Sequence, residues 1–173
     1  MQLQLFIQMD QLKHYTEIAN ELEGRNPQAF ETLEEEINIL IHKLKFIPME
    51  SRPNVLIQHL NSSVIDQDYL EEIMQVAGGK LLASNQDLNE ADFLIFIHDA
   101  PDFFSKLPQL LETQYAEIKA VKDNQIYIIN KAKFGTVKSD YLQDIEILAE
   151  IVQSKYFIYG HEGNSWVKFS MSI

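Results

Sequence analysis

The first part of the chain has the apolar spacing of helices. Between residues 27 and 47, apolar side chains recur every three or four positions and form one stripe. The stripe comprises Leu33, Ile37, Leu40, Ile41, Leu44 and Ile47. Acidic residues stand in the early turns and lysines in the last turn, as the helix dipole favours. Gly24 and Pro27 separate this helix from an earlier one. The pattern predicts helices near residues 9–23 and 27–46.

Beyond a short linker with a proline at each end, residues 48–53, the pattern changes. Short apolar runs now alternate with segments of helical spacing. Strands are expected at 54–60, 80–84, 92–98 and 125–130, and helices at 68–79, 103–112 and 139–153. Strands that alternate with long helical crossovers form a largely parallel sheet. We therefore predict a three-layer α/β fold, with residues 1–50 as a helical N-terminal arm and residues 51–173 as the α/β lobe.

Composition and charge exclude several function classes. The chain has 173 residues, of which 46% are hydrophobic, enough for a packed core. Its net charge of −12 argues against a nucleic-acid partner, which needs a basic face. The absence of cysteine excludes disulfides, thiolate nucleophiles and Cys-ligated metal sites. No apolar stretch approaches the length that spans a bilayer, so no membrane insertion is expected.

The catalytic motifs of common enzymes are also missing. There is no G-x-S-x-G turn for a serine nucleophile, and "VAGGKL" lacks the spacing of a phosphate-binding loop. Glu71 and Glu72 are adjacent in a helix and splay apart, which does not suit an acid–base pair. We expect no enzymatic activity, no cofactor and no bound metal of the protein's own.

Four segments, in order, carry a resemblance to a known family. They are "SRPNVLIQHL", "DYLEEIMQVAGGKLLAS", "LNEADFLIFIHD" and "YAEIKAVKDNQIYIIN". From about residue 33 onward the chain resembles the C-terminal lobe of a helical-backbone (class III) periplasmic substrate-binding protein. This family delivers ferric siderophores, haem or cobalamin to ABC importers. The resemblance implies a metal-chelate ligand and an ABC permease, or a second lobe, as partners. It implies a periplasmic location if a signal peptide has been removed; otherwise the cytoplasm is expected.

Two departures from the family pattern bear on function. The arm at residues 1–47 stands where the family has a first lobe. The stretch "KFGTVKSD" carries no glutamate where family members have one that docks on the permease. The alternative hypothesis is therefore a non-catalytic protein-interaction module that derives from such a lobe and has no small-molecule ligand of its own.

The candidate ligand contacts lie where the expected strands end. In open α/β sheets, ligands bind beyond the carboxyl ends of the strands. The residues predicted there are His59, Asn61 and Ser62 after the first strand, His98, Asp99 and Phe103 after the third, and Phe134 after the fourth. Imidazole can ligate iron or cobalt, a carboxylate can fix its tautomer, and aromatic rings can stack on a planar ligand.

Each of these residues also has a structural interpretation. Asp99 can cap the helix after Pro101, and the serines at 62 and 63 can cap the helix that follows them. Phe103 and Phe104 can belong to the core. In the tail "YGHEGNSWVKF", at 159–169, the aromatic residues suit either a packed strand that covers a sheet edge or a self-association surface.

Overall fold

A computed structural model describes residues 7–60, 65–83, 85–98 and 100–171 of the chain. Its centre is a five-stranded sheet with strand order β2-β1-β3-β4-β5. Four strands run parallel, and the last is antiparallel to its neighbour β4. The strands are β1 (Asn54–His59), β2 (Lys80–Leu81), β3 (Phe93–Ile97), β4 (Ile126–Ile129) and β5 (Trp166–Phe169). The prediction of a mostly parallel sheet is confirmed.

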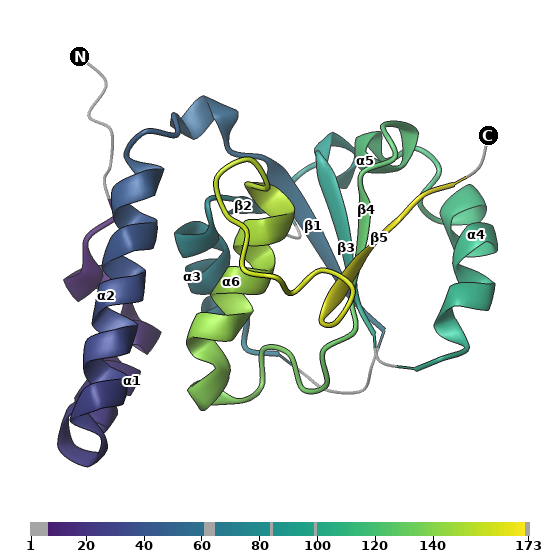
Figure 1. Cartoon of the computed structure of the whole chain (residues 1–173). Coiled ribbons are helices and arrows are strands. Elements are labelled where there is room, and N and C mark those ends of the chain that lie inside the picture. The colour runs from purple at the N-terminus through teal and green to yellow at the C-terminus, as the bar shows by residue number, and fades with distance from the viewer. Residues whose placement is uncertain (1–6, 61–64, 84, 99, 172–173) are drawn as a thin grey trace.

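Helices cover both faces of the sheet (Figure 1). On one face lie α3 (Gln67–Ala77) and α6 (Tyr141–Val152), and outside them pack α1 (Lys13–Arg25) and α2 (Pro27–Leu44). On the other face lie α4 (Phe103–Thr113) and the short α5 (Lys119–Lys122). Single 3₁₀ turns occur at Met9–Gln11, Met49–Ser51, Leu88–Glu90 and Lys138–Asp140. The predicted three-layer α/β fold is therefore observed, with the N-terminal helices stacked on one outer layer.

Alternating side chains of the strands fill two cores, one on each face. Ile57, Ile95 and Ile129 point toward α3 and α6 and share a core with the N-terminal helices. Leu56 and Phe96 point to the opposite face and pack with the α4 side chains. Because both faces are covered, β3 is apolar along its whole length, as the run at 93–97 predicted.

The edge strand β2 is shorter than the sequence predicted. Among the described residues, Lys80 and Leu81 are in register with β1 and the N–H of Leu82 donates to the Val55 carbonyl at 2.9 Å, whereas the apolar run had suggested a strand over 80–84. The chain turns away because the backbone N–H of Ala83 donates to the side-chain oxygen of Gln86 at 2.7 Å, and the N–H of Gln86 donates back to the Ala83 carbonyl. The hydrogen bonds between Ala83 and Gln86 thus follow the end of the strand, and residue 84 lies outside the described residues.

The C-terminal tail closes the opposite edge of the sheet. Strand β5 pairs with β4 through the register Ile129↔Trp166, and Trp166 is 6% exposed. Of the two interpretations of the tail, the packed edge strand is the one observed. None of the helices in the described part of the chain is both long and apolar enough to cross a membrane.

Candidate ligand-binding site

The sheet has a topological switch point between β1 and β3. The chain leaves β1 through α3, on one face, to reach β2, and it leaves β3 through α4, on the other face, to reach β4. Diverging crossovers of this kind open a crevice at the carboxyl ends of the two strands, where open α/β proteins bind ligands. His59 is the last residue of β1, and His98 directly follows β3.

His98 is held in one orientation by its neighbours. Its Nδ1 accepts a hydrogen bond from the Ala100 N–H at 2.8 Å, and its ring stacks on Phe103 with centroids 4.5 Å apart and 15° between the planes. A nitrogen that accepts a hydrogen bond carries no proton, so the proton of the neutral ring sits on Nε2. In this tautomer Nε2 of His98 is a hydrogen-bond donor and is not set up to ligate a metal.

His59, at the end of β1, lines a cavity of about 490 Å³. The walls come from the end of β1, from Gln67 and Leu70 of α3, and from Leu81 to Ala83 and Leu88 beyond the short β2. Partial burial lowers the pKa of His59 below its ordinary value. Its imidazole is consequently neutral at pH 7, with one nitrogen that donates and one that accepts.

The two histidines leave the sheet on opposite faces. His59 pairs with Ile97, the last residue of β3, so His98 lies one position beyond this pair. Side chains alternate along a strand, and His59 shares the face of Ile57 whereas His98 shares that of Phe96. The geometry argues against their joint ligation of one metal. Within the described ranges, no three His, Asp or Glu side chains gather to hold a metal ion.

The aromatic candidates are less accessible than the sequence suggested. Phe103 is 5% exposed and Phe134 is 2% exposed, and both belong to core clusters. Phe134 lies in the core cluster that includes residues of α6, and its predicted contact with a ligand stays a prediction. Phe104, 40% exposed, is the phenylalanine of this group that solvent reaches. The predicted contacts Asn61, Ser62 and Asp99 lie outside the described residues.

A buried polar cluster follows β4, and the sequence analysis missed most of it. Asp144 of α6 is 0% exposed; it pairs with Lys131 at 3.1 Å and accepts hydrogen bonds from the Tyr69 hydroxyl and the Gly135 N–H. Lys131 also pairs with Asp140 at 2.9 Å. Burial raises the pKa of the Asp144 carboxyl against the opposing effect of Lys131. The signal in the sequence was an aspartate on the apolar face of a helix.

This cluster fixes the loop after β4. The Gly135 contact and the Lys131 pair hold the loop against α6, which turns Phe134 inward. A second cavity, of about 230 Å³, lies beside the same loop and is lined by His14, Asp66, Tyr69 and residues Gly135 to Lys138. The loop therefore borders the carboxyl-end rim of the sheet.

Comparisons with known proteins identify the fold. No family model and no curated protein matches the chain. Among solved structures, an ABC transporter solute-binding protein from Sulfurospirillum deleyianum is similar with a TM-score of 0.59 and 16% identity, covering 88% of this chain and 55% of that one. A periplasmic binding protein from Veillonella parvula has a TM-score of 0.54 and 8% identity, with coverages of 77% and 47%.

A third similar structure is Helicobacter pylori CeuE in a complex with nickel and histidine. Its TM-score is 0.53 at 13% identity, and the match covers 81% of this chain and 51% of that one. This chain thus has the fold of ABC solute-binding and periplasmic binding proteins, and it spans about half the length of the solved structures that it matches.

Proposed function

We propose that this chain is the substrate-binding component of an ABC importer, or the C-terminal lobe of a class III component, for an iron or cobalt chelate such as a siderophore, haem or cobalamin. In this proposal it acts in the periplasm, delivers its ligand to a permease and catalyses no reaction. Residues 1–50 form the arm, and residues 51–173 form the ligand-binding lobe. The observation that carries the proposal is the oriented His98 donor at the switch point of a binding-protein fold.

The chemistry of the rim suits a chelate whose metal is already coordinated. An Nε2–H donor from His98 complements the oxygen atoms of a carboxylate, hydroxamate or catecholate. The neutral His59 can hydrogen-bond the ligand's periphery, and the accessible ring of Phe104 offers an apolar surface. None of these contacts requires the protein to replace a ligand of the metal.

The proposal is tested by titration with haem, cyanocobalamin, a ferric catecholate and a ferric hydroxamate, followed by visible absorbance and Trp fluorescence. We expect saturable binding of one of them and a Kd about tenfold higher for His98→Ala, the loss of one hydrogen bond to a charged group. His42→Ala, on the exposed face of α2, is the matched control and leaves the Kd unchanged. Flat titrations with all four chelates contradict the proposal.

A non-catalytic protein-interaction module remains the second candidate function. The observation in its favour is the pair of exposed apolar side chains Ile39, on α2, and Phe46, directly beyond its end. Under this alternative the four titrations are flat, and substitutions on α2, but not His98→Ala, abolish binding to a protein partner.

A further inference from the structure

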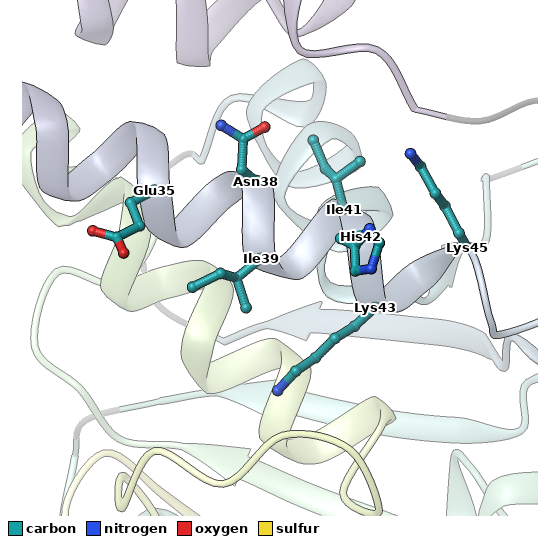
Figure 2. Close-up of a pocket in the computed structure, with 7 residues that line it drawn as sticks. All are labelled: Glu35, Asn38, Ile39, Ile41, His42, Lys43 and Lys45. Atoms are coloured by element: carbon teal, nitrogen blue, oxygen red, sulfur yellow. The ribbon is translucent and has the colours of Figure 1, made fainter.

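The outward side of α2 and the residues directly after it carry a row of exposed side chains, of which Glu35, Asn38, Ile39, His42 and Lys45 are drawn in Figure 2. Seen along the helix, these residues recur at intervals of three and four and point away from the buried stripe of Leu33, Ile37 and Leu40. The outer face of α2 is defined here as Gln28, Glu31, Glu35, Asn38, Ile39, His42, Lys45 and Phe46, all exposed. The helix has 18 residues, so the face extends over about 27 Å.

This face combines a hollow with exposed apolar groups. A hollow of about 540 Å³ is lined by its residues Glu35, Asn38, Ile39, His42 and Lys45 together with neighbouring side chains of α2 (Figure 2). Ile39 is 40% exposed and Phe46 is 72% exposed. The rings of His42 and Phe46 meet edge to face, with centroids 5.6 Å apart. Apolar groups gathered on one exposed face commonly mark an interaction surface.

Charge is segregated along the helix. Glu31, Glu34 and Glu35 lie in its first half, whereas His42 and Lys43 lie in its last turn and Lys45 directly follows. The basic end stands out in a chain of net charge −12. A helix with one acidic and one basic half repels a parallel copy of itself but attracts an antiparallel one.

We propose that a second copy of this chain docks antiparallel on the outer face of α2 and forms a symmetric dimer. A two-fold axis between Asn38 and Ile39 places Glu35 of each copy opposite His42 of the other. It also places Glu31 beside the Lys45–Phe46 end. The same patch serves both copies, as a closed two-fold interface requires. Ile39 then lies next to the axis, and Phe46 lies at each end of the interface.

The mixed charge of this face selects the second copy over other occupants. Nucleic acid and anionic lipid surfaces favour uniformly basic patches, and Glu31 and Glu35 would repel them. In an antiparallel pair, the acidic half of α2 in one copy faces the basic end of α2 in the other copy. A second copy therefore complements both ends of this face.

The first test is sedimentation velocity of the full chain over a wide concentration range at pH 7.5. We expect a concentration-dependent dimer whose Kd rises about tenfold or more in the double variant Ile39→Glu/Phe46→Glu, which desolvates one charge next to the axis and another at each end of the interface. Phe104→Glu is the matched control, since Phe104 has the same 40% exposure as Ile39 but lies on α4, and it keeps the wild-type Kd. Circular dichroism confirms that each variant folds.

The second test is a charge exchange across the proposed axis. Glu35→Lys removes the acceptor opposite the His42 ring, and His42→Glu puts two carboxylates opposite one another at two symmetric places, so each variant weakens the dimer by about tenfold. The double variant Glu35→Lys/His42→Glu restores the attraction and returns the Kd toward the wild-type value. A monomer at every concentration, a dimer insensitive to Ile39→Glu/Phe46→Glu, or a double variant as weak as the single ones overturns the proposal.

Discussion

A single carboxylate, that of Glu150, fixes the turn that leads into β5. It is 4% exposed on α6 and accepts hydrogen bonds from the backbone N–H groups of Tyr159, Gly160 and His161 and from the indole N–H of Trp166. Burial disfavours the charged form, but these donors outweigh it and hold the pKa of Glu150 below its ordinary value. Four donors on one carboxylate explain why the segment before β5, which contains two glycines, has a single backbone conformation.

The depressed pKa of Glu150 makes the tail sensitive to acid. A carboxyl whose folded pKa is depressed contributes stability above its unfolded pKa, and that stability is lost as the pH falls through the folded pKa. We expect Glu150→Gln to lower the free energy of unfolding at pH 7 by about 1–3 kcal/mol, because an amide replaces an acceptor and adds unpaired N–H groups. As the pH falls below about 5, the free energy of unfolding of the wild type should decrease more than that of the variant.

Urea unfolding followed by the fluorescence of Trp166, the single tryptophan, measures both effects. Glu112→Gln is the control, since Glu112 is an exposed residue of α4. Parallel pH profiles for the wild type and Glu150→Gln would show that the Glu150 carboxylate does not contribute in this way.

The start of α1 depends on a residue far away in the sequence. Its N-cap, Leu12, makes no side-chain cap hydrogen bond. Glu72 of α3 supplies the acceptor instead: its carboxylate receives the N–H groups of His14 at 2.9 Å and Tyr15 at 2.8 Å, and the Tyr141 hydroxyl at 2.8 Å. One buried side chain thereby connects the arm, α3 and α6. The sequence predicted a helix near 9–23 but not this tertiary cap, which no local pattern encodes.

Replacement of Glu72 should loosen α1 before the rest of the protein. In Glu72→Gln, an amide N–H₂ group takes the place of one carboxylate oxygen, and this group faces donors that it cannot accept from. We therefore expect a loss of about 2–4 kcal/mol in the free energy of unfolding. Hydrogen–deuterium exchange should show faster exchange of the α1 amides and a smaller change in the central strands. Glu71→Gln, an exposed neighbour on the same helix, is the control and should lie within about 0.5 kcal/mol of wild type. Uniform exchange changes across the chain would contradict the capping role.

At the scale of the whole molecule, the sequence predicts the layers well and the site less well. The apolar run of β3 and the glycines after α3 mark elements by local chemistry, and these elements are observed. The relation between His59 and His98 depends instead on the β1–β3 register, which places His59 beside Ile97 and sends the two rings to opposite faces. Phe134 likewise turns inward because Asp144, on the following helix α6, holds its loop. Strand register and loop anchoring are tertiary properties that a single sequence does not display.

The arm and the lobe share one core, which makes a prediction about the whole fold. The buried residues Leu33, Ile37, Leu40 and Leu44 of α2 belong to the same apolar cluster as Ile73 of α3. Each such side chain contributes about 1.5–3 kcal/mol on burial, so removal of the arm exposes an apolar face that the lobe cannot cover. We therefore expect residues 1–50 and 51–173 to unfold together in one transition.

Two probes separate the arm from the lobe in a urea titration. Far-UV circular dichroism includes the helices of the arm, whereas Trp166 reports on the lobe alone. Coincident midpoints and slopes indicate one cooperative unit, and a fragment of residues 51–173 should then lack a cooperative transition. If the dichroism falls first while Trp166 keeps its native emission, the arm is an independent unit, and the predicted boundary at residues 50 and 51 separates two folding domains. One titration therefore decides whether that boundary is a thermodynamic one or only a change in sequence pattern.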